Sequence, residues 1–141
     1  MSVNLFRTRD ALRESLLDTS ALSLAFAPAS ASGNAFAGAL AALPQPISID
    51  PTKVYWVGQS LGGILGTLNA AANPRIGTAV LNVPGGTLTD VFTSPQSALS
   101  ANLAPILSSL GITAGTPQYL QFLQVAKLIL DGGDPINFAG H

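Results

Sequence analysis

Apolar residues recur at helical spacing at both ends of the chain and form short continuous runs in its middle. The segment from Leu5 to about Phe26 predicts a helix, with most of its charged residues away from the apolar side. Its apolar residues are expected to share one face: Leu5, Leu12, Leu16 and Leu17. The segment 117–130 predicts a second helix, with Pro117 suited to the first turn. The apolar positions of that helix are Tyr119, Phe122, Leu123, Ala126 and Leu130.

The continuous apolar runs predict two strands separated by a helix. Residues 54–57 form the first strand, 61–72 the helix and 76–83 the second strand. The second run is apolar enough to be buried on both faces of a parallel sheet. Further helices are predicted over 35–43 and 96–110, and a loop of small residues over 28–34.

These elements predict a helix-rich α/β fold in a single partial domain. Residues 1–53 supply N-terminal helices, 54–86 a strand–turn–helix–strand core, and 87–141 helices that resemble a cap or lid. Two strands do not make a stable sheet alone. We therefore expect either a piece of a larger protein or copies that assemble and cover the strand edges.

Composition narrows the classes of partner. Charged residues make up 9% of the chain and hydrophobic residues 48%, with a net charge of -1, so no nucleic-acid partner is expected. The scarcity of charge favours a homo-oligomer, membrane proximity or a lipid-like substrate, although the low-charge surface of a secreted protein would give the same composition. The acidic residues lack metal-ligand spacing, and there is no cysteine, so no metal or other cofactor is expected. No stretch is long and apolar enough for a transmembrane segment, and the N-terminus lacks a signal-peptide core.

A candidate nucleophile lies where the first strand meets the helix. Gly58, Ser60 and Gly62 fit the G-x-S-x-G pattern, in which a serine on a sharp strand-to-helix turn presents its Oγ above the sheet. Small residues on both sides of the serine would let the strand and the helix approach closely. The N–H of Leu61, at the helix N-terminus, would stabilise an oxyanion. The alternative is a structural strand–turn–helix; the pattern of a phosphate-binding loop is absent.

Several segments, in order, resemble one family. The segments 9–18, 54–63, 78–86 and 130–138 are similar to bacterial extracellular lipases of the virulence-factor type, in the α/β-hydrolase superfamily. The resemblance implies a truncated α/β-hydrolase fold with its parallel strands around a nucleophile elbow. It also implies an acyl-enzyme at Ser60, and helices between 87 and 130 that line an acyl pocket or simply cover the sheet. Gln59, Gly85 and Gly86 are expected beside the bound substrate. Localisation is left open: the resemblance implies a secreted bacterial protein, but the chain carries no export signal.

The acid and base of a catalytic triad are the missing parts. In this superfamily they follow the nucleophile in the order acid, then histidine, and His141, the last residue, is the only histidine. His141 of the same or a neighbouring chain is the candidate base, although a terminal residue is often not fixed in place. Asp90 is predicted to be a helix cap or first-turn residue. Asp131 and Asp134 are predicted to be helix-end and turn residues, and none of the three is assigned as the acid.

Two functions follow. The first is a serine carboxylesterase of lipase type that cleaves a small-molecule or lipid ester through Ser60. The alternative is a catalytically incomplete hydrolase fragment that binds a hydrophobic ligand or associates with itself.

Overall fold

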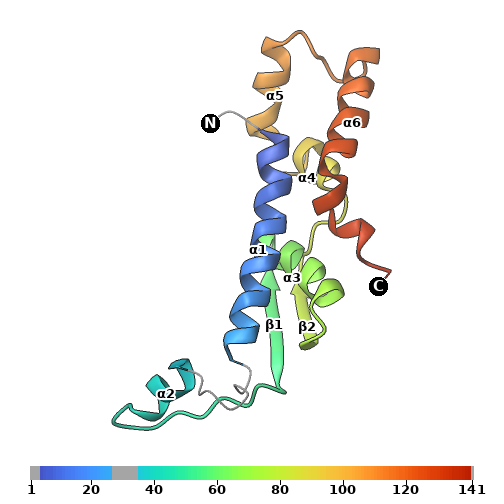
Figure 1. The fold of residues 1–141 in the computed structure, drawn as a ribbon. Coiled ribbons are helices and arrows are strands. Elements are labelled where there is room, and N and C mark those ends of the chain that lie inside the picture. Colours follow the sequence, from blue (N-terminus) through green and yellow to red (C-terminus); the bar gives the residue numbers. More distant parts are fainter. Residues whose placement is uncertain (1–3, 27–34, 141) are drawn as a thin grey trace.

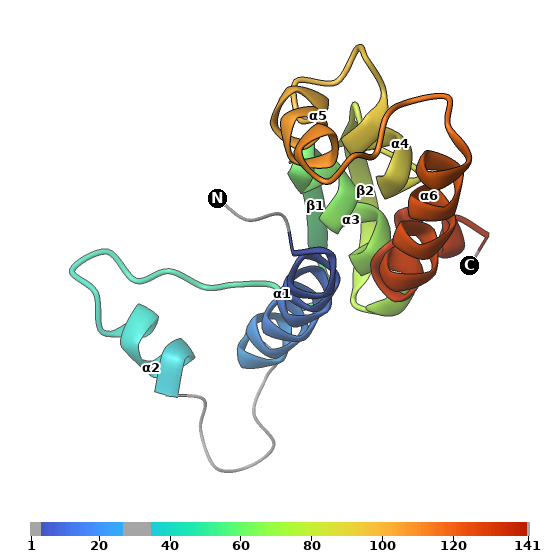
Figure 2. The ribbon, with the colours of Figure 1, turned by 90° about the horizontal axis from the view of Figure 1, so that it is seen from above.

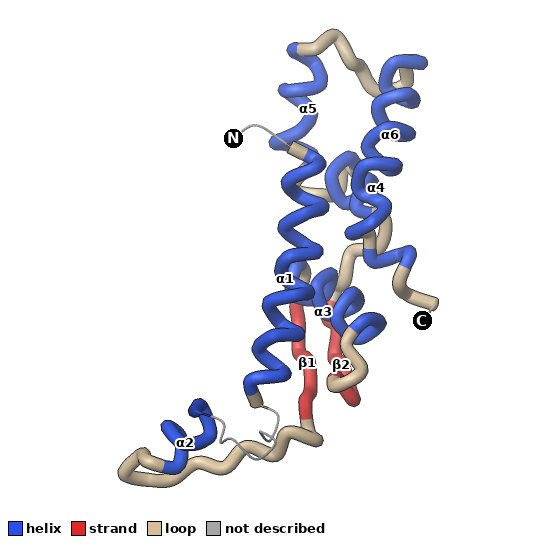
Figure 3. The backbone as a smooth tube through the Cα atoms, viewed as in Figure 1, coloured by secondary structure: helices blue, strands red, loops and turns tan. Residues whose placement is uncertain are grey.

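The computed structural model describes residues 4–26 and 35–140, and it shows a helix-rich α/β fold (Figure 1, Figure 3). The elements follow the predicted order in the first half of the chain: α1 (Leu5–Ala25), α2 (Ala35–Ala41), β1 (Val54–Gln59), α3 (Leu61–Ala72) and β2 (Ile76–Asn82). The second half holds α4 (Leu88–Thr93), α5 (Ser100–Ser109), α6 (Pro117–Leu130) and the short 3-10 turns η1 (Asp131–Gly133) and η2 (Pro135–Asn137). The predicted loop over 28–34 lies outside the described residues.

The sheet consists of β1 and β2, which pair in parallel with Val57 opposite Val80. The helix α3 connects them and packs against both strands on one face of the sheet. This strand–helix–strand unit confirms the predicted centre of the fold. Parallel pairing requires such a crossover, because the chain must return to the end of the sheet where the first strand began before the second strand can start.

The hydrophobic core lies where α3 meets helices from both ends of the chain. α1 packs on α3 and on α6, so the N-terminal helix joins the centre of the fold to its C-terminal part. The buried residues of this core are Leu12, Ile64, Leu68, Leu88 and Leu130. Farther along α1, the buried amide of Asn73 donates a hydrogen bond to Ser23 Oγ at 3.2 Å, which ties the end of α3 to the end of α1.

One residue departs from the predicted apolar face of α1. Leu12 is buried and Leu5 packs against the core, but the side chain of Leu17 is 64% exposed. The reason is helical geometry: at 3.6 residues per turn, a residue five positions after Leu12 points about 140° away from it. The prediction that Leu17 shares the buried face was therefore wrong.

The prediction that the second strand is buried on both faces was also wrong. β1 alternates between covered and exposed residues, and so does β2 from Thr78 onwards. The outer face of the sheet presents Tyr55, Val57 and Val80, with exposed fractions of 64%, 81% and 58%. No element of the described chain covers this face. The apolar run correctly predicted a strand. Burying the second face of that strand would require a cover other than the described residues.

The helices α4, α5 and α6 lie beyond the carboxyl ends of the two strands (Figure 1). The helix α4 was not predicted, and α5 begins at Ser100 rather than at residue 96. Ahead of α5 the chain turns, with the N–H of Ser97 bonded to the carbonyl of Ser94 at 2.9 Å. Pro95 lies within that turn, where it fits better than in a helix interior.

The helix α2 stands apart from the other helices (Figure 2). No helix in the described part of the chain has the length and hydropathy needed to span a membrane.

Candidate active site

Ser60 holds a strained backbone conformation at the junction of β1 and α3. Its φ of 53° and ψ of -114° lie in a region that residues other than glycine rarely adopt. Its N–H donates to the carbonyl of Asn82 at 3.0 Å, and its carbonyl accepts from Gly63 and Ile64 at 2.8 and 3.0 Å. Such a conformation costs about 1–3 kcal/mol and persists only where the surroundings impose it. Here β2 holds the serine on one side and the first turn of α3 on the other.

Gly58 is what allows the helix to begin so close to the strand. A Cβ atom on Gly58 would lie 2.0 Å from the carbonyl oxygen of Gly62, which no side chain tolerates. A Cβ on Gly62 itself would meet nothing within 4 Å. The expectation that both glycines of the pattern serve close approach is therefore correct for Gly58 and wrong for Gly62.

Two other glycines of α3 also face the sheet. A Cβ on Gly66 would lie 2.4 Å from the indole nitrogen of Trp56. A Cβ on Gly63 would lie 3.0 Å from the Cα of Pro84, just after β2. The close contact between α3 and the sheet thus extends over one and a half turns beyond Ser60.

Trp56 fixes the start of α3, a role that the sequence reasoning missed. Its indole Nε1 donates to the carbonyl of Gly62 at 2.9 Å, and its ring lies against Gly66. The sequence does contain a cue for this role. Trp56 lies on a strand that is followed by a glycine-rich helix, and glycines on a helix make room for a large ring.

The hydroxyl of Ser60 and the first N–H groups of α3 have no partners among the described residues. Ser60 is exposed, and within the described residues its Oγ makes no hydrogen bond. The N–H groups of Leu61 and Gly62 likewise have no acceptor there, as is usual for the first turn of a helix. The helix N-terminus carries a partial positive charge of roughly half an elementary charge. An anion that forms next to Ser60 would therefore meet a free N–H group and a favourable helix dipole.

The structure places the predicted substrate-binding residues on different sides of the elbow. Gln59 is exposed on the outer face of the sheet, opposite Asn82. Gly85 packs inward, where a Cβ would lie 2.6 Å from a methyl group of Val91. Gly86 is exposed near Ile136. Packing thus explains Gly85 without a substrate.

Asp90 and Asp131, which follow the elbow, make local hydrogen bonds, in agreement with their predicted roles. Asp90, in the first turn of α4, accepts from the hydroxyl of Thr87. Asp131 accepts from the amide of Asn137 at 2.9 Å. His141 lies outside the described residues, so the position of the candidate base is not given.

Asp134 is the one fully buried carboxylate in the described part of the chain, and it acts as a cap. It accepts from the N–H of Leu88 at 2.8 Å and from the N–H of Ile136 at 3.3 Å. It therefore supports the starts of α4 and η2, two segments 46 residues apart in the chain. No three acidic or histidine side chains within the described ranges come together as a metal site.

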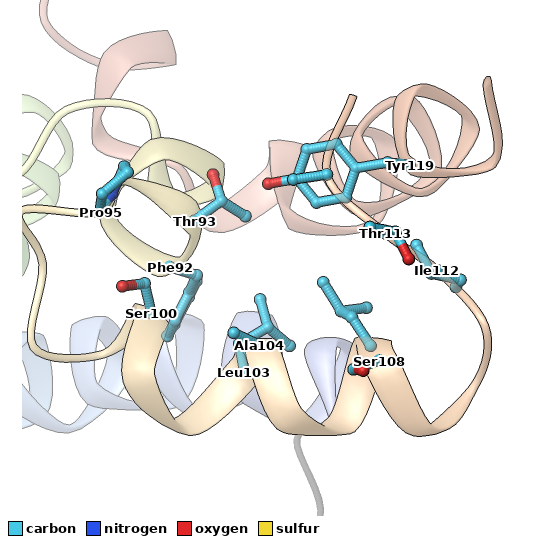
Figure 4. Close-up of a pocket in the computed structure, with 12 residues that line it drawn as sticks. Phe92, Thr93, Pro95, Ser100, Leu103, Ala104, Ser108, Ile112, Thr113 and Tyr119 are labelled. Carbon is cyan, nitrogen blue, oxygen red and sulfur yellow. The ribbon is translucent and has the colours of Figure 1, made fainter. Parts of the chain in front are cut away.

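Two cavities lie among the helices, and one of them reaches the neighbour of Ser60. The larger, of about 890 Å³, is bounded by α1, α3, α4 and α5 and includes Leu61, the neighbour of Ser60. The smaller, of about 390 Å³, lies among α4, α5 and the start of α6, and Figure 4 shows Tyr119 reaching across it towards the side of Thr93. Phe92 and Leu103 line both cavities. These two side chains therefore stand between the two spaces.

Comparisons of the chain with protein-family models, with curated proteins and with solved structures gave no significant match. The geometry around Ser60 is therefore the basis on which function is inferred.

Proposed function

We propose that the protein is a serine carboxylesterase of α/β-hydrolase type, which forms an acyl-enzyme at Ser60. The observation that carries the proposal is the conformation of Ser60, with φ 53° and ψ -114° between a parallel strand and a helix. Strained backbone at a residue other than glycine is concentrated at functional sites. Val83 and Thr87 also have positive φ, of 45° and 51°, but of the three only Ser60 lies directly between a strand and the helix that follows it.

The groups around Ser60 suit acyl transfer. Ser60 Oγ attacks the ester carbonyl carbon and gives its proton to a base, while the carbonyl electron pair moves onto oxygen. The N–H of Leu61 donates to that oxyanion. When the carbon–oxygen bond of the alcohol breaks, the base returns the proton to the leaving alkoxide, and water then hydrolyses the acyl-enzyme by the same steps.

The base is proposed to be His141, from the same chain or from a neighbouring copy. Loss of a triad member still leaves roughly 10³–10⁴-fold catalysis over water where the oxyanion donors and binding groups remain. Efficient turnover therefore needs this histidine, and a base that comes from a second copy would make activity depend on protein concentration.

A second candidate function is favoured by the uncovered outer face of the sheet. Tyr55, Val57 and Val80 form an exposed apolar surface, and surfaces of this kind mark sites of association. In this alternative the chain is a catalytically incomplete hydrolase that associates with itself or binds a hydrophobic ligand, and Ser60 is only a turn residue.

Hydrolysis of p-nitrophenyl butyrate separates the two functions. Wild type is compared with Ser60→Ala, His141→Ala and the control Ser109→Ala, whose exposed hydroxyl only bonds a helix carbonyl of α5. The esterase predicts loss of at least ~10³-fold in the Ser60 and His141 variants and full activity in the control. Equal rates in wild type and Ser60→Ala would reject the esterase.

A further inference from the structure

The lining of the larger cavity is mostly apolar, and most of its polar and charged groups come from α1 and its N-cap. α3, α4 and α5 contribute apolar side chains, among them Leu61, Leu65 and Phe92. The N-terminal half of α1 contributes polar and charged groups: Asn4, Arg7, Thr8 and Ser15. Ligand sites commonly combine an apolar lining with a few polar groups that fix orientation. A volume of about 890 Å³ is within the range of small-molecule sites.

Among the described residues that line this cavity, Arg7 is the only charged one and none is acidic. Within the part of the chain that the structure describes, Arg7 forms no ion pair. The nearest acidic residue along α1, Asp10, is engaged by Arg9, with 2.8 Å between Nε and Oδ1. The hydrogen bond from Arg9 lowers the pKa of Asp10, and Asp10 makes no ion pair with Arg7.

The other polar groups that line the cavity differ in whether they already make hydrogen bonds. The hydroxyls of Thr8 and Ser15 donate to carbonyls of the α1 segment, at 3.1 and 2.9 Å. The side-chain amide of Asn102, on α5, makes no hydrogen bond within the described ranges. Asn4 accepts the N–H of Arg7 through its Oδ1 and keeps its side-chain N–H groups unpaired within the described residues. The donors available to a ligand are thus the guanidinium of Arg7 and the side-chain N–H groups of Asn4 and Asn102. The guanidinium suits an anionic oxygen rather than a cation, and a side-chain amide N–H can donate to the same oxygen.

We propose that this cavity binds an aliphatic chain that carries a carboxylate at its far end, with the carboxylate paired to Arg7 and the chain against Leu61, Leu65 and Phe92. Because Leu61 adjoins Ser60, the chain would be the acyl part of an ester attacked by Ser60, and this assignment rests on the proposed function. The substrate class is then a half-ester of an aliphatic dicarboxylic acid. Its anionic end, rather than chain length alone, would select it.

Charge complementarity favours this ligand over a neutral acyl chain. A guanidinium recognises a carboxylate with two parallel hydrogen bonds, which a terminal methyl group cannot make. A neutral chain would fill the apolar lining equally well but would leave Arg7 without a partner. The alternative occupant of the cavity is a helix from a second copy of the chain. Binding of a free ligand distinguishes a ligand site from such a contact.

The kinetic test compares two esters with acyl chains of equal length. p-Nitrophenyl hydrogen adipate carries the terminal carboxylate, and p-nitrophenyl hexanoate ends in a methyl group. We expect wild type to prefer the adipate ester in kcat/KM, and Arg7→Gln to reduce this preference about tenfold. Arg13→Gln, which removes an exposed arginine of α1 that does not line the cavity, is the matched control and should keep the preference. An unchanged preference in Arg7→Gln would overturn the inference.

A binding test keeps this inference separate from the proposed function. Octanoate and 1-octanol are titrated calorimetrically into Ser60→Ala and into the double variant Ser60→Ala with Arg7→Gln. We expect octanoate to bind the first protein more tightly than octanol does, and the double variant to lose about tenfold in octanoate affinity. This result together with no ester hydrolysis by wild type would reject the esterase and retain the anion site. Equal octanoate affinity in both proteins, or none in either, would overturn the site.

Discussion

At the scale of single residues, the elbow depends on Ser60 and on the groups that hold it in place. Ser60 keeps a positive φ because β2 accepts its N–H while the first turn of α3 donates to its carbonyl. Trp56 adds a side-chain hydrogen bond to the same turn. The glycines around the serine contribute unequally, and this inequality is testable.

Gly58→Ala is expected to destabilise the protein by about 3 kcal/mol or more, because its Cβ would lie 2.0 Å from the carbonyl oxygen of Gly62 and the backbone would have to shift. Gly62→Ala is the matched control: a Cβ there meets nothing, so its stability should stay within about 0.5 kcal/mol of wild type or rise slightly. Urea unfolding followed by Trp56 fluorescence measures both. Equal losses in the two variants would contradict the packing described for the elbow.

At the scale of elements, the buried carboxylate of Asp134 joins α4 to the C-terminal segment. Because it accepts from Leu88 and Ile136, the start of α4 is capped by a residue distant in sequence. Thr87, which immediately precedes α4, makes no side-chain cap to the helix backbone. The position of α4 therefore depends on the correct docking of the segment that follows α6.

Asp134→Ala should lower the free energy of unfolding by about 2–3 kcal/mol, because it leaves the buried N–H of Leu88 without an acceptor. Asp18→Ala, which removes an exposed carboxylate of α1, should change the free energy of unfolding by no more than about 0.5 kcal/mol. Chemical unfolding of both variants checks the prediction. A loss in Asp134→Ala no larger than in Asp18→Ala would show that the cap contributes little.

The same contact explains what the sequence did and did not predict. The elbow and its flanking elements were predictable because every cue is local. These cues are an apolar run, a glycine pattern, and the pair Asn73 and Pro74 directly after the helix. The helix α4 was missed because its N-terminus is capped by Asp134, 46 residues away. The uncovered outer face of the sheet was also missed, since an apolar strand gives no sign of which partner covers it.

At the scale of the whole molecule, the chain exposes more surface than its size requires. Its accessible surface is 9150 Å², whereas a folded monomer of this mass is expected to expose about 6,800 Å². The separate position of α2 contributes to this excess (Figure 2). The outer face of the sheet contributes as well, with Tyr55, Val57 and Val80 exposed. We propose that a second copy covers this face.

Light scattering coupled to size-exclusion chromatography tests that assembly. Wild type should elute as an assembly heavier than the 14.3 kDa monomer, and Val57→Lys should shift it towards the monomer, because a charge at the centre of a buried apolar contact is costly. Leu128→Lys is the control, since it replaces a similarly exposed leucine on α6. A monomeric wild type, or equal effects of the two substitutions, would contradict assembly through the sheet.

The central claim is that Ser60 is a working nucleophile, and covalent labelling tests it most directly. Purified protein is treated with a fluorophosphonate, and adducts are located by peptide mass spectrometry in wild type, Ser60→Ala and Ser109→Ala. We expect a single adduct on Ser60 in wild type and in Ser109→Ala, and none in Ser60→Ala. A wild-type protein that stays unlabelled while folded, or that is labelled equally in Ser60→Ala, would contradict the claim.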